Sequence, residues 1–322
     1  MSHVSQNCKT CAGVAVALGK LGEGIKGDRM ERKTPAVVAL GMFDGVHIGH
    51  KALLERTVGE AERFCAVPAA YTFSNHPMET LGGSVRLLTD VYERNDLIRS
   101  LGIEELVSEP FTKETAALSP EAFVEMLLIR WDVCAMVVGY NYTFGERALG
   151  TPETLRLIGR RKGFSVVSVP PVVLHDAPVS STRVRETIER GELELAAELL
   201  GRPYLLSGRI VQNRRIGRRI GFPTANIEPD EKRVLPPDGV YATNAYVHGA
   251  MYRAVTNVGA NPTVHGDKRS VETYLIGFDA DIYGAELQIG FRFRIRDEIT
   301  FDSMDTLKAQ IEKDVAAADK KR

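Results

Sequence analysis

Two histidines, His47 and His50, lie three residues apart in the stretch GMFDGVHIGH, which covers residues 41–50. The apolar run AVVAL precedes this stretch and KALLERTVGEAERF, with helical spacing, follows it, so we expect a turn from a strand into a helix. In open parallel sheets, ligands bind at the carboxyl ends of strands, and N–H groups at a helix start attract anions. Imidazole donors there, charged if protonated, would stabilise charge developing on phosphate oxygens. The chemistry that fits is attack on the α-phosphate of a nucleoside triphosphate, with pyrophosphate leaving.

A second pair of polar residues, Thr224 and Asn226, lies in GFPTAN. Residues two apart in an extended segment place their side chains on one face. A hydroxyl and an amide oxygen are hard ligands suited to Mg²⁺, with phosphates completing its shell. This segment is therefore a candidate metal site.

Two further segments carry groups that can contact anions. SSTRVR, residues 180–185, offers hydroxyls and guanidinium groups to a phosphate, although alone it is equally well explained as a helix cap with solvated arginines. NRRIGRRIG, residues 213–221, has four arginines. Four charges on one loop usually mean a solvated face, and an anionic partner is the alternative.

The elements that must position these residues change character along the chain. From Pro35 to about Val169, short apolar runs alternate with amphipathic stretches, which predicts a parallel, doubly wound sheet with flanking helices. In SPEAFVEM, Ser119 is the expected N-cap of a helix, with Pro120 at its first position. After Ser180, we expect a helix through STRVRETIERGELELAAELLG, ended by Gly201.

The rest of the chain is rich in short β-type runs. Alternation such as FRFRIR, between turn residues, predicts a small antiparallel β-barrel. A last helix is expected through SMDTLKAQIEKDVAAADKK, with Ser303 or Asp302 as its cap. The predicted fold class is therefore α/β plus β, a Rossmann-like domain followed by a barrel with a C-terminal helix. The predicted division is an extension at 1–33, a sheet domain at 34–186, a helical linker at 187–202 and a barrel domain at 203–322.

Composition and charge limit the classes of function. The chain has 322 residues, about two domains' length, and its formal net charge of −1 gives no global basic field, so we expect no nucleic-acid partner. No apolar stretch approaches the roughly 20 residues that span a bilayer, so we expect no membrane partner. Four cysteines do not make a disulfide framework, and the Cys8–Cys11 pair lacks a second pair at zinc-ligand spacing. We expect a cytoplasmic protein, and a homo-oligomer stays open because the sequence does not give the oligomeric state.

Several motifs in one collinear order resemble a known family. GMFDGVHIGH is similar to the H-x-G-H signature of the nucleotidyltransferase superfamily. The further segments are TFSNHP at 72–77, VVGYNYTFG at 137–145, VSSTRVRETIERGELELAAELLGRPY at 179–204, RRIGFPTANI at 218–227, PPDGVYAT at 236–243, TNVGANPT at 256–263 and SVETYLIGFDADIYG at 270–284. From about residue 35 to 318 the chain resembles the prokaryotic bifunctional riboflavin kinase/FAD synthetases. The resemblance implies an N-terminal nucleotidyltransferase domain that adenylylates FMN and a C-terminal barrel that phosphorylates riboflavin, each with ATP and Mg²⁺. Riboflavin, FMN and FAD are the implied flavin substrates and products.

For the transferase reaction, the resemblance implies a catalytic pair and a set of ATP-binding residues. His47 and His50 fall on the family's paired histidines, which bind the ATP phosphates and the leaving pyrophosphate. The implied ATP- and phosphate-binding residues of this domain are Gly41, Phe43, Gly45, Gly49, Asn141, Ser180, Ser181, Thr182 and Arg185. The last four match the family's S-S-T-x-x-R.

For the kinase reaction, the resemblance implies a base, a metal site and two binding loops. Glu272, in SVETYL, aligns with the general base for the ribityl hydroxyl, and Thr224 and Asn226 align with the Mg²⁺ ligands. The implied phosphate-side residues are Gly217, Arg218 and Gly221, and the implied flavin-binding residues are Asn257 and Arg296.

One departure from the family pattern keeps alternatives open. Asn75 stands where the family usually has a proline in F-x-P-H-P, so we expect a less rigid loop and a less firmly held flavin in the transferase site. This feature favours a second hypothesis, a monofunctional riboflavin kinase with a degenerate N-terminal domain. A third is a non-catalytic flavin- or nucleotide-sensing regulator, and the retention of both sets of site residues speaks against it.

Overall fold

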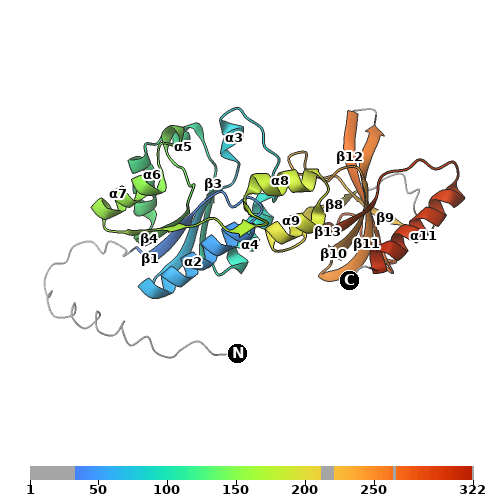
Figure 1. The fold of residues 1–322 in the computed structure, drawn as a ribbon, viewed down its shortest axis with the longest axis horizontal. Coiled ribbons are helices and arrows are strands. Elements are labelled where there is room, and N and C mark those ends of the chain that lie inside the picture. Colours follow the sequence, from blue (N-terminus) through green and yellow to red (C-terminus); the bar gives the residue numbers. More distant parts are fainter. Residues whose placement is uncertain (1–32, 212–220, 264–265, 321–322) are drawn as a thin grey trace, which may run out of the picture.

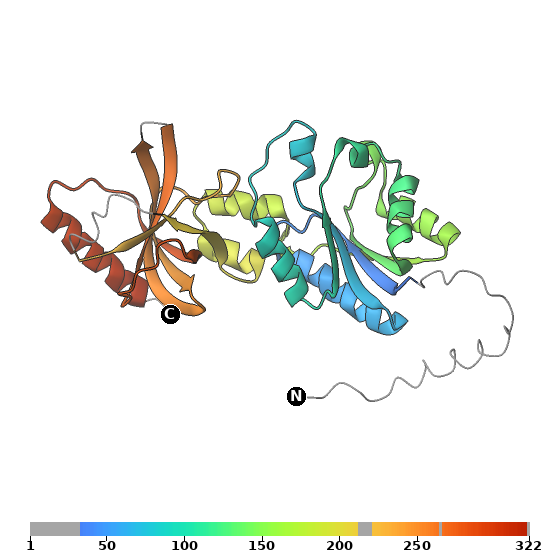
Figure 2. The ribbon, with the colours of Figure 1, turned by 180° about the vertical axis from the view of Figure 1, so that it is seen from behind.

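The chain folds into two bodies with a pair of helices between them (Figures 1 and 2). A computed structural model describes residues 33–211, 221–263 and 266–320. The first body holds a parallel sheet with helices, and the second holds a closed barrel with one long helix against it. In these described residues, no helix is both long and apolar enough to cross a membrane.

Five parallel strands form the sheet, in the order β3-β2-β1-β4-β5. They are β1 (Pro35–Leu40), β2 (Val67–Phe73), β3 (Glu105–Glu109), β4 (Asp132–Gly139) and β5 (Ser165–Val169). The central strand, β1, is buried except at Pro35, as expected of a strand covered on both faces. The strand order reverses between β1 and β4, and their carboxyl ends lie side by side. The predicted doubly wound sheet is confirmed.

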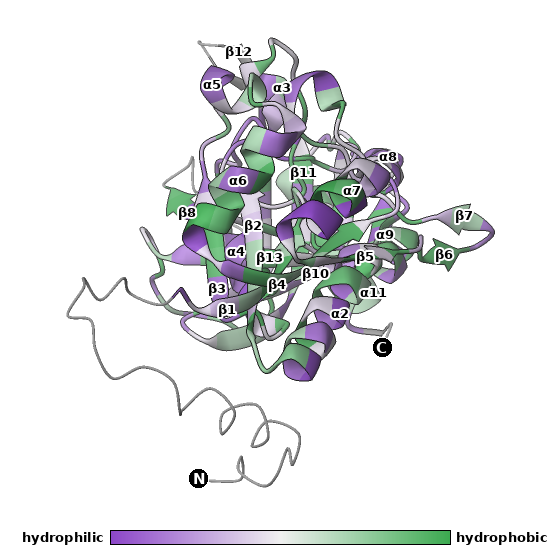
Figure 3. Cartoon of the chain, turned by 90° about the vertical axis from the view of Figure 1, so that its left-hand side faces the viewer, coloured by the Kyte–Doolittle hydropathy of each residue, from purple (hydrophilic) through white to green (hydrophobic). Residues whose placement is uncertain are grey.

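Helices cover both faces of this sheet. They are α2 (Ile48–Phe64), α4 (Val91–Ser100), α6 (Pro120–Arg130) and α7 (Pro152–Lys162), with the short turns α3 (Pro77–Thr80), α5 (Lys113–Ala116) and η1 (Glu146–Ala148). α2 and α4 pack on one face through Leu54 and Ile98, while α6 and α7 pack on the other through Val124 and Leu155. Ser119 caps α6 as predicted. Figure 3 shows both hydrophilic and hydrophobic residues on α2 and α7, as amphipathic helices require.

One prediction was wrong: the expected single helix before the barrel is two helices, α8 (Ser181–Glu189) and α9 (Leu193–Leu200). Gly191 lies between them at φ 77°, a left-handed conformation that ends a helix, and α9 ends at Gly201 as predicted. A small hairpin of β6 (Val173–Leu174) and β7 (Ala177–Pro178) precedes them. The apolar faces of α8 and α9 share a core with the barrel, through Val184, Ile188, Leu193, Ala196, Leu199 and Leu200.

Six antiparallel strands close the barrel, in the order β10-β11-β12-β9-β8-β13. They are β8 (Tyr204–Val211), β9 (Thr224–Ile227), β10 (Gly239–Val247), β11 (Ala250–Thr263), β12 (Gly266–Leu275) and β13 (Glu286–Arg296). Three buried hydroxyls, from Thr243, Thr256 and Thr273, link β10, β11 and β12 on the inner face at 2.8 and 3.0 Å. α11 (Met304–Lys320) follows its cap, Ser303, and packs on the outer face of β10 and β11. The predicted barrel and C-terminal helix are confirmed.

Candidate functional site

The histidine turn lies where the strand order reverses, at the carboxyl end of β1. A cavity of about 700 Å³ opens there. Gly41 and His50 line it after β1, and Gly139 and Asn141 line it at the end of β4. Much of the remaining wall is aromatic: Phe43, Tyr71, Phe73, Phe111, Phe123, Tyr142 and Phe144. The structure thus brings the predicted histidine turn and Asn141 to one cavity, whose rings suit a flat aromatic ligand.

His47 and His50 are stacked, with ring centroids 3.7 Å apart and 15° between their planes. His47 is the N-cap of α2, since its Nδ1 accepts the backbone N–H of His50 at 3.2 Å. That bond leaves the proton of a neutral His47 ring on Nε2. Nδ1 of His50 is buried and meets no hydrogen-bond partner in the part of the chain that the structure describes. A buried, unsatisfied ring nitrogen is a feature that a ligand can explain.

Both histidine rings are neutral near pH 7. Burial, together with Arg185 and Arg202, lowers the pKa of His47 to about 4. Burial, followed by His47 and Arg185, also lowers the pKa of His50 well below its ordinary value. Without a ligand, the rings therefore act as neutral donors, and the positive charge of the turn comes from the arginines around it.

The glycines of the turn are required by close packing. Gly45 has φ 80°, and a Cβ there would lie 2.6 Å from the Leu88 side chain. A Cβ on Gly41 would lie 2.9 Å from the Phe43 ring, and one on Gly49 would lie 3.0 Å from the first histidine ring. A side chain at any of these three positions would displace its neighbours, so the glycines fix the fold of the turn.

The serine–arginine segment begins α8 against this turn. Ser180 is the N-cap and accepts an N–H from the first turn, so the capping explanation holds for this residue. The Ser181 hydroxyl donates to the backbone oxygen of Asp44 at 2.8 Å. Arg185 pairs with the Asp44 carboxylate, also at 2.8 Å. Thr182 lies between them in the first turn of α8, and no described hydrogen bond of its side chain joins it to the histidine turn.

Asp44, which was not among the predicted site residues, is 2% exposed and ties the turn to a distant segment. Its carboxylate accepts the backbone N–H groups of Leu88 at 3.0 Å and Thr89 at 3.2 Å, besides pairing with Arg185. The Gly45 N–H in turn donates to the Thr89 hydroxyl at 3.1 Å. The available signal was a carboxylate between apolar neighbours in GMFDGVH, because a buried carboxylate must be paired or hydrogen-bonded.

Asn75, the departure from the family motif, is held by its own amide. Its Oδ1 accepts the Phe111 N–H at 2.7 Å, and its Nδ2 donates to the Phe111 oxygen at 3.2 Å and to the Thr80 hydroxyl at 3.0 Å. These bonds fasten the loop at the edge of the cavity. A proline would restrict the backbone φ angle of the loop, whereas Asn75 holds the loop through side-chain hydrogen bonds.

The candidate metal site opens onto a second cavity, of about 370 Å³, in the barrel. Gly221, Thr224 and Asn226 line it, together with Asp279 and Asp281. The Asn226 amide lies 3.4 Å from the Thr224 hydroxyl, so the predicted shared face is confirmed. Hydroxyl, amide and carboxylate oxygens fit Mg²⁺. The described residues contain no group of three or more His, Cys, Asp or Glu side chains placed to hold a metal, so a Mg²⁺ at Thr224 and Asn226 would need phosphate oxygens to complete its shell.

Glu272 stands in a row of polar residues across three neighbouring strands. The strand register pairs it with Asn226 on β9 and with Asn257 on β11. Directly paired residues share a face, and here it is the outer face, because the neighbouring Thr273 belongs to the inner row. Burial raises the pKa of Glu272, which favours its accepting a proton. Asn257 also donates to Glu298 at 3.1 Å.

Three other predicted kinase positions are not placed at this row. Arg296 forms a two-pronged ion pair with Asp314 of α11, at 2.8–3.1 Å, so it fastens that helix to β13. Gly217 and Arg218 lie outside the described residues, as do Cys8 and Cys11.

Two family models match the chain in succession. One described as FAD synthetase matches residues 29–183, and one described as riboflavin kinase matches residues 200–321. The first covers the sheet with its histidine turn, and the second covers the barrel with Thr224 and the Asn226–Glu272–Asn257 row.

Curated proteins match over almost the whole length. The chain is 36% identical over 293 residues to a bifunctional riboflavin kinase/FMN adenylyltransferase of Bacillus subtilis, covering 88% of this chain and 92% of that protein. It is 34% identical over 303 residues to the protein of the same name from Escherichia coli K12, covering 93% and 96%. The chain also superposes on a crystal structure of a protein named as a macrolide-efflux protein, from Streptococcus pneumoniae, with TM-score 0.83 and 31% identity, covering 92% of this chain and 96% of that one.

Proposed function

This chain belongs to the family of bifunctional riboflavin kinase/FMN adenylyltransferases, and from that premise we propose which of its residues carry each reaction. The chain phosphorylates riboflavin to FMN with ATP and adenylylates FMN to FAD with release of pyrophosphate. We assign FAD formation to the cavity beside the histidine turn and riboflavin phosphorylation to the barrel. The observation that supports this division is that each cavity lies within the stretch matched by a different family model.

In the transferase site, His47 and His50 are the proposed catalytic pair. Their neutral N–H groups would donate to phosphate oxygens at the α-phosphate and on the departing pyrophosphate. The negative charge of ATP would raise their pKa values, so that a proton is more firmly held as charge develops on the leaving group. Asn141 and the aromatic wall would orient the flavin and adenine rings, while Ser181 and Arg185 would contact phosphate from α8.

In the kinase site, Glu272 is the proposed general base for the ribityl hydroxyl. Its raised pKa brings the carboxylate nearer to the operating pH, where a base is most effective. Thr224 and Asn226 are the proposed Mg²⁺ ligands, and the bound ion would neutralise charge on the transferred phosphoryl group. Gly217, Arg218 and Gly221 are the proposed phosphate-side residues, and Asn257 and Arg296 the flavin-side residues. A cytoplasmic location stays a prediction.

Two variants, each assayed for both reactions, test the assignment of FAD formation to the first body and of riboflavin phosphorylation to the barrel. His47→Ala with His50→Ala should abolish FAD formation from FMN while riboflavin phosphorylation persists. Glu272→Gln should give the reverse pattern. If the double histidine variant makes FAD at a near wild-type rate, or if both variants lose both reactions in folded protein, the assignment is wrong.

A further inference from the structure

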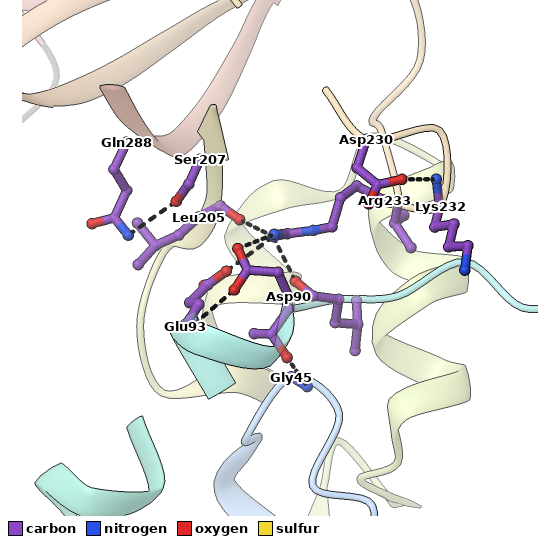
Figure 4. A network of polar contacts seen from close by, with 12 residues as sticks. Gly45, Asp90, Glu93, Leu205, Ser207, Asp230, Lys232, Arg233 and Gln288 are labelled. Carbon is purple, nitrogen blue, oxygen red and sulfur yellow. Dashed lines mark hydrogen bonds and ion pairs between the residues drawn. The ribbon is translucent and has the colours of Figure 1, made fainter. Parts of the chain in front are cut away.

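A barrel residue reaches the transferase turn through one segment of the first body. Arg233, on the loop between β9 and β10, is 4% exposed. Its guanidinium donates to the backbone oxygen of Leu88 at 2.9 Å and to that of Leu205, in β8, at 2.8 Å. Figure 4 shows this arginine between the barrel strand and the start of α4. One buried side chain therefore joins the barrel to Leu88.

Two carboxylates at the start of α4 face the same guanidinium. Glu93 lies 3.1 Å from it and Asp90, the cap of α4, lies 3.5 Å from it. A backbone bridge pairs Leu87 with Arg233, with hydrogen bonds of 2.6 and 3.1 Å on either side. Because a buried guanidinium without partners is costly, these contacts hold residues 87–93 in one position.

Leu88 connects this network directly to the transferase turn. Its carbonyl accepts from Arg233, and its N–H donates to Asp44 at 3.0 Å. Asp44 in turn pairs with Arg185 and lies three residues before His47. The path from Arg233 to the turn therefore runs through Leu88 and the adjoining Thr89, which also bonds Asp44 and Gly45.

A second arginine from the C-terminal half contacts the turn itself. Arg202, which follows α9, donates to the backbone oxygen of Gly45 at 3.0 Å and to that of Val46 at 3.4 Å. Those carbonyls immediately precede His47, the cap of α2. The residues that lead into His47 are thus hydrogen-bonded to groups outside the sheet: Asp44 to Leu88, and Gly45 and Val46 to Arg202.

We propose that Arg233 and Arg202 are positioning residues for adenylyl transfer, so that the C-terminal half of the chain sets the geometry of the histidine turn without touching the substrate. The inference rests on the proposed assignment of FAD formation to the first body. Misplacement of reacting groups by about 1 Å can lower a rate roughly 10²-fold. Loss of Arg233 should therefore act on kcat more than on KM.

The test compares three variants of the full chain in both reactions. Arg233→Met should lower kcat for FAD formation by about tenfold or more, with riboflavin phosphorylation within about twofold of wild type. Arg233→Lys, which keeps a charge facing Asp90 and Glu93, should recover part of the loss. Arg269→Met is the matched control: Arg269 bonds the Pro236 oxygen and Asp238, both within the second body, and its loss should leave FAD formation unchanged.

A double-mutant cycle separates positioning from general loss of stability. If Arg233 acts through Leu88 on Asp44, then Arg233→Met should lower kcat for FAD formation much less in an Asp44→Asn background than in the wild-type protein. Additive losses, or equal loss of both reactions, would overturn the inference. If Arg233→Met does not fold, Arg202→Lys decides instead, and a folded Arg202→Lys variant with wild-type kcat for FAD formation would reject the inference.

The proposed function has its own control in the same assay. If His47→Ala with His50→Ala still makes FAD, the assignment of the site fails. If that variant is inactive while Arg233→Met and Arg202→Lys are fully active, the positioning role alone fails.

Discussion

The transferase turn is held by side chains from several distant stretches of chain, whereas the kinase row is held by backbone pairing between adjacent strands. Asp44 collects bonds from residues 88–89 and from α8, and Arg202 arrives from beyond α9. Asn226, Glu272 and Asn257 instead follow from the register of β9, β12 and β11. A site built on register depends on one sheet, while a site built on converging side chains depends on every element that supplies one. The barrel's site should therefore survive separation better than the first body's.

The largest effect is expected when the barrel is produced as a fragment without the first body. A fragment starting near Ser180 keeps α8 and α9, whose buried residues complete the barrel core, and should fold and phosphorylate riboflavin. A fragment starting at Tyr204 loses six buried apolar side chains, each worth about 2–5 kcal/mol when large, which together exceed the roughly 5–15 kcal/mol stability of a domain. It should not fold. Circular dichroism and kinase assays decide, and an active shorter fragment would contradict the shared core.

The next effect concerns the kinase row alone. Glu272→Gln keeps the shape of the side chain but removes its basicity, so kinase turnover should fall roughly 10²–10⁴-fold, or by about 3–5 kcal/mol of barrier. Apparent affinity for Mg-ATP should change little, and FAD formation from supplied FMN should not change. Steady-state assays of one purified protein are sufficient. A kinase rate within about threefold of wild type, below the range of general-base effects, would reject the assignment.

A pH effect should distinguish the transferase turn from the barrel. The folded-state pKa of His47 is about 4, against about 6.5 in an unfolded chain, so the unfolded state binds more protons between these values. Stability should therefore be full above pH 6.5 and fall as the pH drops toward 4, by roughly 2–4 kcal/mol from this ring. Urea unfolding at pH 7 and pH 5 measures the loss. His47→Gln should flatten the pH dependence, and an unchanged slope would show that the ring is not buried in its neutral form.

The smallest expected effect is at the edge of the transferase cavity. Asn75→Pro restores the residue usual in the family but removes the bonds to Phe111 and Thr80. Proline gains about 0.4–1 kcal/mol at a compatible site, against roughly 1–3 kcal/mol for an unsatisfied buried group. We expect a net loss near 1 kcal/mol and a changed KM for FMN with little change in kcat. A gain in stability on thermal unfolding would show that the amide bonds contribute nothing.

The sequence predicts the parts of both sites that are local. The strand-to-helix turn at His47 and the shared face of Thr224 and Asn226 depend on short-range spacing, and the structure has both. The position of Gly191 was also a local signal, but the strong helical pattern on either side of it concealed the break.

What the sequence could not provide is the convergence of distant residues. Asp44, Arg202 and Arg233 become neighbours of the turn only through the packing of the two bodies, and a lone arginine or aspartate carries no periodic signal. The neutral state of the histidines likewise follows from burial, which depends on the tertiary structure.

The burial of Leu88 has a consequence for synthesis on the ribosome. This side chain is 1% exposed and belongs to the core of the barrel and α9 rather than to that of its own sheet. Its backbone partner Arg233 is translated 145 residues later, which at about 5–20 residues per second is a delay of roughly 7–30 s. During that interval the newly made first body displays the apolar Leu88 side chain and the Glu93 carboxylate without their partners from the barrel. In the complete chain the Glu93 side chain is only 7% exposed. Because transiently exposed apolar surface is prone to aggregate, we expect the nascent first body to bind chaperones until the barrel emerges and covers it.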